Sequence, residues 1–141
     1  MKKIFLFSML ALAGLASKAQ VYYPDGTTIT STVAMTDINN VTYDLFTMTN
    51  QGKHVIIDLS ATWCGPCWSY HQSKVLDHYQ DKYGPQGTSP LKDGMAILYE
   101  VDASTTLQDL QGTGGNTQGD WVTGTTHPIC SPANSNAVVT K

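Results

Sequence analysis

Two short runs of apolar residues stand out from an otherwise polar chain. Their sequences are HVIIDL, from His54 to Leu59, and MAILYEV, from Met95 to Val101. Both contain β-branched or aromatic side chains, and neither alternates regularly between apolar and polar positions. This pattern is typical of strands that are buried on both faces of a sheet. We therefore predict two buried strands at these positions.

The apolar spacing between the two runs changes to that of a helix. Apolar side chains recur there at helical intervals: Trp68, Val75, Leu76, Tyr79 and Tyr83. The spacing predicts one helix from Cys64 to Tyr83. Gly84-Pro85 ends it, because glycine can take the left-handed position after a helix and proline cannot continue one. A strand, a helix and a second strand in this order form a right-handed crossover between parallel strands, which predicts an α/β fold.

The remaining segments carry weaker signals. Residues 20–36 are rich in Thr, Ser and Tyr and predict an extended lead-in with short edge strands at most. Residues 42–49 form an amphipathic patch that is too short to classify. Residues 111–124 are rich in Gly and Thr and predict a flexible surface insertion, within which Trp121 alone is expected to dock onto the fold. This insertion lacks the GKS or GKT sequence of a phosphate-binding loop.

The first residues have the three-part layout of a secretory signal peptide. A positive head, Met1-Lys2-Lys3, precedes an apolar run from Ile4 to Leu15, and Ser17-Lys18-Ala19 places small residues at a cleavage site before Gln20. We expect residues 1–19 to be removed and residues 20–141 to form one exported domain, periplasmic or extracellular in a bacterium, with no membrane span. The alternative is an N-terminal membrane anchor, for which the apolar run is short.

Charge and composition exclude one class of partner and set the redox environment. The chain has 8 basic residues, all of them Lys, and 11 acidic ones, so removal of residues 1–19 leaves a net charge of −6. A chain without Arg and with this balance is not expected to bind nucleic acid. Export places the three cysteines where disulfides form and persist, and an odd number leaves one unpaired within the chain.

The candidate chemistry lies where the first strand gives way to the helix. Cys64 falls at the helix N-terminus, where unpaired amides and the positive end of the helix dipole favour the thiolate, the attacking species. Cys67 lies one turn further on, close enough to bond Cys64. Pro66 suits the first helical turn, where its missing N–H costs little, and Trp63 can shield one side of the sulfur pair.

Asp58 is an acidic residue inside the first apolar run. Burial of a carboxylate is costly without a partner or a role, and it raises the carboxyl pKa. A raised pKa would suit Asp58 to exchange a proton with Cys67 through a water. The alternative is that Asp58 lies at the end of the strand and only hydrogen-bonds a loop. From the residues alone the two interpretations are equal.

The segment DLSATWCGPC, from Asp58 to Cys67, resembles the thioredoxin superfamily. With Gly52-Lys53 before the strand, residues 52–101 are similar to exported thioredoxin-like proteins of the TlpA/redoxin type. The resemblance implies an α/β thioredoxin-like fold, with a central mixed sheet flanked by helices. It also implies thiol–disulfide oxidoreductase activity that needs no metal or organic cofactor.

The resemblance further implies a role for each residue of the motif. Cys64 would be the nucleophile and Cys67 the resolving thiol, the two forming a redox-active disulfide, and Asp58 would be the buried acid. Trp63, Gly65 and Pro66 would flank the site, and the Gly-Pro pair is the one found in reducing members. The partners implied are proteins that carry disulfides or dithiols, with a membrane thiol reductase as a candidate electron donor.

Two features depart from the family. Neither Pro128 nor Pro132 has the setting of the family's cis-proline loop, so we expect a domain that is incomplete at its C-terminus and lacks the last hairpin and helix. The lysine that family members often carry near the buried acid is also unmatched, because Leu98 or Glu100 occupies that region.

Other interpretations of the cysteines and histidines are weaker. A zinc site from Cys64, Cys67, His127 and Cys130 is disfavoured by Pro66 and the helix start. A purely structural Cys64–Cys67 bridge would close a very short loop and add little stability. Cys130 is a free thiol, the partner of a cysteine outside this chain, or a small semi-buried residue, the last being preferred. His71 and His78 are expected on the surface.

Two other functions remain to be weighed against an oxidoreductase. The first is a non-catalytic binding module of a larger secreted protein, with residues 111–124 as its contact surface. The second is a peroxidase-type redoxin, which would need an Arg to activate its cysteine, and this chain has none.

Overall fold

A three-stranded parallel sheet is the centre of the structure, a computed structural model that describes residues 33–131. The strand order is β3-β4-β5, with bounds His54–Ser60, Gly94–Glu100 and Ile129–Cys130. β3 and β4 pair along their whole length, and β5 pairs with Leu98 and Tyr99 of β4. An antiparallel bridge between Asp37 and Cys130 mixes strand directions at this side of the sheet.

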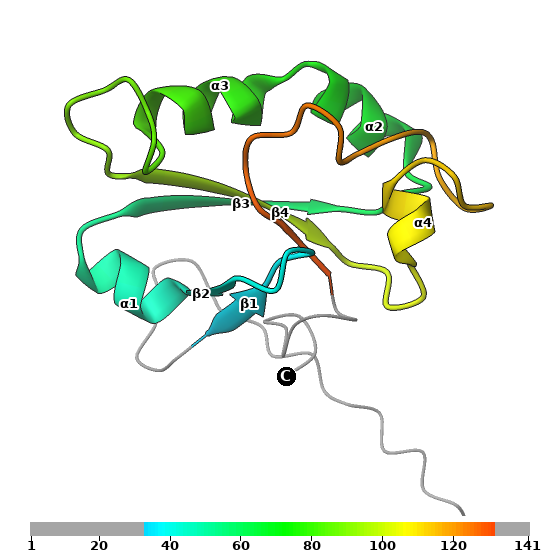
Figure 1. Ribbon diagram of the computed structural model, residues 1–141, viewed down its shortest axis with the longest axis horizontal. Coiled ribbons are helices and arrows are strands. Elements are labelled where there is room, and N and C mark those ends of the chain that lie inside the picture. The colour runs from blue at the N-terminus through cyan, green and yellow to red at the C-terminus, as the bar shows by residue number, and fades with distance from the viewer. Residues whose placement is uncertain (1–32, 132–141) are drawn as a thin grey trace, which may run out of the picture.

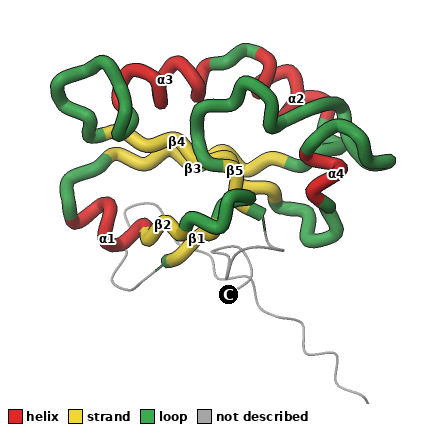
Figure 2. Tube along the Cα trace, in the orientation of Figure 1, coloured by secondary structure: helices red, strands yellow, loops and turns green. Residues whose placement is uncertain are grey.

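Helices flank the sheet on both faces (Figures 1 and 2). On one face, α2 (Gly65–Gln72) and α3 (Val75–Tyr83) lie end to end. On the other face lie α1 (Leu45–Asn50) and the antiparallel pair β1 (Ala34–Thr36) and β2 (Thr42–Asp44). The short α4 (Leu107–Leu110) follows β4, near the end of the sheet from which α2 starts. This is a thioredoxin-like α/β arrangement, as the sequence predicts.

β4 divides the core into two clusters, and its predicted burial on both faces is confirmed. All seven of its residues are buried. Met95, Ile97 and Tyr99 face the cluster that includes Leu45 of α1, whereas Leu98 faces a second cluster. That second cluster also contains Leu110, Trp121 and Ile129, with Cys67 and Trp68 packed against it.

β3 differs from the prediction of a strand buried on both faces. Ile56 is 40% exposed and Leu59 is 58% exposed, while Val55 and Ile57 are partly buried against the first core cluster. Among residues 33–131, β3 pairs only with β4, whereas β4 has a strand on each side. Similar apolar runs therefore have different burial because they occupy different places in the sheet.

The predicted single helix from Cys64 to Tyr83 is two helices, so that prediction is also wrong. The break lies at Ser73 and Lys74, where Lys74 takes the left-handed conformation with φ of 57°. This conformation is unfavourable for a residue with a Cβ atom. The side chain of Lys74 compensates by approaching Asp77 at 3.4 Å and the Gly124 carbonyl at 3.5 Å. These contacts hold the start of α3 against a segment distant in sequence, which the local spacing could not indicate.

Several predictions concern residues outside the described range. The signal peptide at residues 1–19 and the lead-in up to residue 32 are among them, and so is Pro132. Of the amphipathic patch at residues 42–49, the first part is β2 and the rest belongs to α1. No helix within residues 33–131 has the length and hydropathy to span a membrane.

Candidate active site

The two cysteines of the CGPC sequence are bonded to each other. Cys64 and Cys67 form a disulfide with their Cα atoms 5.3 Å apart. Both residues are half-buried, so the sulfur pair is neither enclosed in the core nor fully in solvent. The pairing of these two cysteines is the one expected from their spacing.

Cys64 is placed where its sulfur meets the start of a helix. It is the N-cap of α2, with extended backbone angles, and its Sγ accepts a hydrogen bond from the amide of Cys67 at 3.3 Å. Pro66 lies in the first turn, where an amide would have no partner within the helix. An amide donor and the positive end of a helix both stabilise sulfur in the thiolate form.

A buried carboxylate holds the turn that precedes Cys64. Glu100, at the end of β4, is 1% exposed and accepts hydrogen bonds from the amides of Thr62 and Asp102, each at 2.8 Å. Burial is the largest influence on Glu100 and raises its pKa, although the hydrogen bonds it accepts oppose the rise. The resemblance to the family places Leu98 or Glu100 near the buried acid, but it does not indicate that Glu100 fixes the backbone before the cysteines.

Trp63 has a side chain that is half-exposed yet fixed in place. Its indole Nε1 donates to Asp102 at 2.8 Å while the ring remains 50% exposed. Asp102 in turn accepts from the amide and hydroxyl of Ser104, which together with Trp63 lower its carboxyl pKa. Trp63 therefore presents an apolar surface beside Cys64 in a set orientation.

The Gly- and Thr-rich segment is part of the site, which corrects the prediction of a flexible surface insertion. The Thr62 hydroxyl donates to the Asn116 carbonyl at 2.9 Å, and the Thr62 carbonyl accepts from the Gln118 amide at 2.9 Å. The Gln118 side chain also donates to the Trp63 carbonyl at 2.9 Å. These bonds connect the loop to the two residues before Cys64.

Side-chain packing also fixes the Gly- and Thr-rich segment, residues 111–124. A Cβ atom on Gly119 would lie 2.5 Å from the ring of Trp68, so this position has room only for glycine. Trp121 is 1% exposed and packs against Trp68 and His71, with ring centroids 5.1 and 4.9 Å apart. The predicted docking of Trp121 is confirmed, whereas the predicted surface position of His71 is wrong, since His71 is 5% exposed. His78 is exposed, as expected.

Asp58 lies within β3, paired with Leu98, and not at the end of the strand. It is half-buried and accepts a hydrogen bond from the Ser60 hydroxyl at 2.9 Å. It also lines a small cavity between the sheet and the helices. The expectation of burial on both faces is therefore not met, and the proton-transfer role of Asp58 stays a prediction.

Cys130 is the free cysteine of the described range, and it is buried in the core. Burial, followed by the nearby charge of Asp37, raises its thiol pKa to about 12. We therefore expect iodoacetamide to label Cys64 and Cys67 in the reduced folded protein, and to label Cys130 only after denaturation. Mass spectrometry with and without guanidinium checks this. Labelling of Cys130 at the rate of the other two in the folded state would contradict the described burial.

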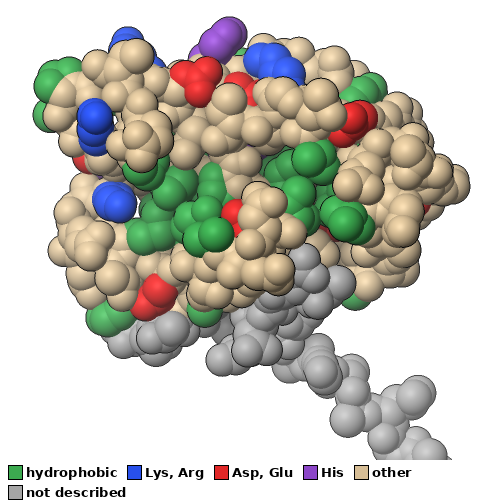
Figure 3. Space-filling model, in the orientation of Figure 1, with side chains coloured by type: hydrophobic (Ala, Val, Ile, Leu, Met, Phe, Trp, Pro, Cys, Tyr) green, Lys and Arg blue, Asp and Glu red, His purple; other side chains and the backbone are tan. Residues whose placement is uncertain are grey.

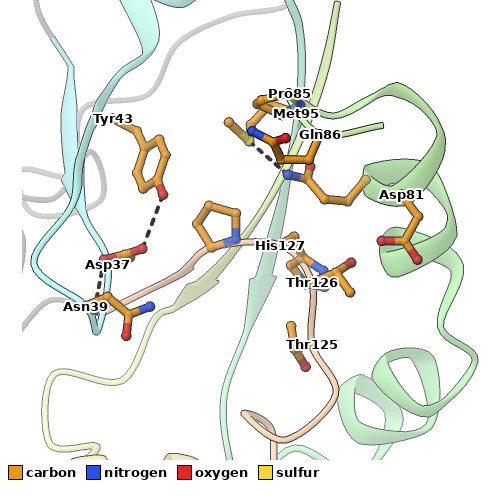
Figure 4. A pocket seen from close by; sticks show the side chains of 12 residues that line it. Asp37, Asn39, Tyr43, Asp81, Pro85, Gln86, Met95, Thr125, Thr126 and His127 are labelled. Carbon is orange, nitrogen blue, oxygen red and sulfur yellow. Dashed lines mark hydrogen bonds between the residues drawn. The ribbon is translucent and has the colours of Figure 1, made fainter. Parts of the chain in front are cut away.

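A large groove lies apart from the disulfide. It has a volume of about 630 Å³, and its walls come from α3, β4 and residues 37–43 and 125–128. Figure 3 shows apolar side chains gathered in the hollow between the two layers. In Figure 4 the Tyr43 hydroxyl points to Asp37, to which it donates at 3.2 Å. Neither Cys64 nor Cys67 lines this groove.

The zinc alternative finds no matching arrangement in the described chain. Within residues 33–131 no group of three or more His, Cys, Asp or Glu side chains is arranged to hold a metal ion. Cys64 and Cys67 are bonded to each other, and His127 contacts Asp77 at 3.1 Å.

The proline at position 128 is not preceded by a cis peptide bond, since the described residues contain none.

Comparison with known proteins gives a local similarity to thioredoxin. A thioredoxin of Coprinus comatus is 49% identical to this chain over 37 residues. The aligned stretch covers 26% of this chain and 33% of that thioredoxin, so the similarity spans about a third of the relative. No protein-family model matches the chain, and no solved structure does. With the α/β fold and the Cys64–Cys67 disulfide, this similarity supports a place in the thioredoxin superfamily and a redox function in general.

Proposed function

We propose that the protein is an exported thiol–disulfide oxidoreductase that reduces or exchanges disulfides of other proteins. The observation that carries the proposal is the Cys64–Cys67 disulfide at the start of α2, with an amide donor aimed at the sulfur of Cys64. The TlpA/redoxin type of this activity, with bacterial export, rests on the resemblance and the predicted signal peptide.

In the first step, Cys64 acts as a thiolate in the reduced protein. It attacks one sulfur of a substrate disulfide, the substrate S–S bond breaks, and the displaced substrate sulfur leaves as a thiolate that takes up a proton. The product is a mixed disulfide between Cys64 and the substrate. The Cys67 amide and the first turn of α2 favour this step because they stabilise negative charge on the sulfur of Cys64.

In the second step, Cys67 resolves the mixed disulfide. Cys67 loses its proton and attacks Cys64, the Cys64–substrate bond breaks, and the substrate leaves as its second thiol. Two cysteine thiols are thereby oxidised to the disulfide seen here, while one substrate disulfide is reduced to two thiols. A dithiol reductant must restore the pair, and a membrane thiol reductase is the donor we propose.

Exposed apolar side chains beside the cysteines suit a protein substrate. Trp63 precedes Cys64 directly, and Tyr70, one turn after Cys67, is 43% exposed. A segment of an unfolded or loosely structured protein could place apolar side chains against these rings while its disulfide meets Cys64. The Gly65-Pro66 pair favours reduction over oxidation as the direction.

Insulin reduction separates this function from that of a non-catalytic binding module. The protein should accelerate precipitation of the insulin B chain by dithiothreitol, in proportion to its concentration. At pH values below about 8.5, the pKa of an ordinary thiol, Cys64 should also be alkylated faster than an ordinary thiol. No acceleration, together with an ordinary pKa for Cys64, would overturn the enzyme proposal and favour a binding module.

A further inference from the structure

A small cavity lies between the sheet and the helices α2 and α3, and neither Cys64 nor Cys67 lines it. Its walls are Asp58 of β3, Tyr70 and His71 of α2, Leu76 and Asp77 of α3, and His127. Its volume is ≈ 10 Å³, close to the minimum of about 10–15 Å³ that one water molecule needs. The cavity therefore has room for about one water between two carboxyl groups and two imidazole rings.

One of these imidazoles is paired with a buried carboxylate. Asp77 Oδ1 lies 3.1 Å from His127 Nδ1 and accepts from the Thr126 amide at 2.7 Å. Burial pushes the pKa of Asp77 up, but the Thr126 amide, His127 and Lys74 together hold it below its usual value. Asp77 is therefore an anion at neutral pH. Since a carboxylate can only accept, His127 Nδ1 carries the proton of this hydrogen bond.

The other ring nitrogen of His127, Nε2, is buried in the interior. Its side chain is 1% exposed, and Nε2 has no hydrogen-bond partner among the described residues. In the tautomer set by Asp77, Nε2 holds a lone pair, so His127 can accept a proton there. The Asp77 carboxylate would stabilise the imidazolium that results. Its surroundings contain both signs of charge: Asp77 of α3, Asp58 of β3, and Lys74 between α2 and α3. Burial lowers the pKa of His127 and the two carboxylates partly oppose this, so the ring is neutral and available.

The second imidazole, His71, is unsuited to the same task. Burial and the charge of Lys74 lower its pKa to about 4, and its Nε2 has no hydrogen-bond partner among residues 33–131. His71 does connect the cavity to the cysteines, because it lies four residues after Cys67 and so on the same face of α2. Leu98 makes a second connection, since it is paired with Asp58 and belongs to the cluster on which Cys67 packs.

We propose that the Asp77–His127 pair stores the proton that Cys67 loses in the resolving step, receiving it by way of Asp58. This inference rests on the proposed function. The proton moves from Cys67 to Asp58 and on to His127, and the imidazolium that results is held by Asp77. The Cys67 thiolate then attacks Cys64, and the proton returns to the departing substrate thiolate. His127 acts through Asp58 and does not touch the reacting sulfurs.

Reaction of the reduced protein with Ellman's reagent tests the proposal. Attack by Cys64 releases one coloured thiolate, and attack by Cys67 on the resulting mixed disulfide releases a second. The leaving thiolate needs no proton, so the rate of the second phase reports how readily Cys67 is deprotonated. The experiment compares wild type with His127→Gln and Asp77→Asn over a range of pH. His78→Gln is the matched control, since His78 is an exposed histidine of α3.

At neutral pH we expect the second phase to slow at least about tenfold in both cavity variants, within the range of general-base effects. The first phase should be unchanged, and His78→Gln should match wild type. The defect should vanish above about pH 9, where an ordinary thiol ionises unaided. A merely structural role for His127 would instead slow the reaction equally at every pH.

The possible results distinguish failure of the proton-store role of His127 from failure of the proposed oxidoreductase function. A normal second phase in His127→Gln across the pH range, or a defect that does not depend on pH, overturns the proton-store role alone. Absence of a second phase in wild type overturns the oxidoreductase proposal as well. If a cavity variant does not fold, NMR titration of the His127 ring in Asp58→Asn decides. Its pKa should fall when the Asp58 charge is removed, and an unchanged value overturns the role.

Discussion

Replacing Cys64 by Ser is expected to abolish insulin reduction, whereas replacing Cys67 by Ser is expected to stop the reaction at the mixed disulfide. The two outcomes differ because the two sulfurs occupy different positions in α2. Cys64 is the N-cap, whose sulfur accepts the Cys67 amide, and Cys67 packs on the core cluster around Leu98. A hydroxyl at position 64 is far too weak an acid to attack a disulfide at neutral pH.

The size of the first effect should be at least a thousandfold, since removal of a nucleophile leaves no route to the covalent intermediate. The Cys67→Ser protein should instead accumulate adducts with substrate proteins. These adducts should appear as additional bands on non-reducing gels and should disappear when dithiothreitol reduces the mixed disulfide. Cys130→Ala is the control for the loss of a thiol as such, because Cys130 is buried away from the site, and it should keep full turnover. Activity in Cys64→Ser above one hundredth of wild type would end the proposed mechanism.

The parts of the fold that depend on neighbouring residues could be predicted from the sequence. The disulfide and the helix start at Cys64 and Pro66 follow from a few adjacent side chains. The helix also ends at Gly84, as predicted, but Gly84 is extended, with φ of −65°, and does not take the left-handed conformation expected of it. In each case the physical cause is contained within one turn.

The parts that were mispredicted depend on contacts between distant segments. The hydrogen bond from Thr62 to Asn116 joins residues 54 positions apart, and it makes a Gly- and Thr-rich stretch part of the site. The left-handed Lys74 is held by Asp77 and by Gly124, 50 residues away. Burial of His71 depends on Trp121, which the composition of its loop marked as unusual without indicating its partner.

The pair Asp77 and His127 could not be found by any local rule. Asp77 lies between Leu76 and His78 in α3, and His127 lies in an irregular segment before β5. Only the packing of this segment against α3 brings the two together, 50 positions apart.

The second large effect is on stability, and it concerns Trp121. Trp121→Ala should lower the free energy of unfolding by about 3–5 kcal/mol, the usual cost of deleting a buried aromatic ring. At about 4 °C per kcal/mol, the value between those of shorter and longer domains, the Tm should fall by roughly 12–20 °C. The loss is expected to be large because the ring packs against both Trp68 and His71 and belongs to the cluster that supports Cys67.

Two matched variants serve as controls for the expected loss of stability in Trp121→Ala. Trp63→Ala removes an equal ring that is 50% exposed, so it should cost less than about 1 kcal/mol. Trp121→Phe keeps an aromatic ring and removes an indole N–H that has no hydrogen-bond partner among residues 33–131, whose burial is itself unfavourable by about 1–3 kcal/mol. Its loss should therefore be well below that of Trp121→Ala. Urea denaturation of the four proteins decides, since an equal cost for Trp121→Ala and Trp63→Ala would mean that the loop is not anchored by this ring.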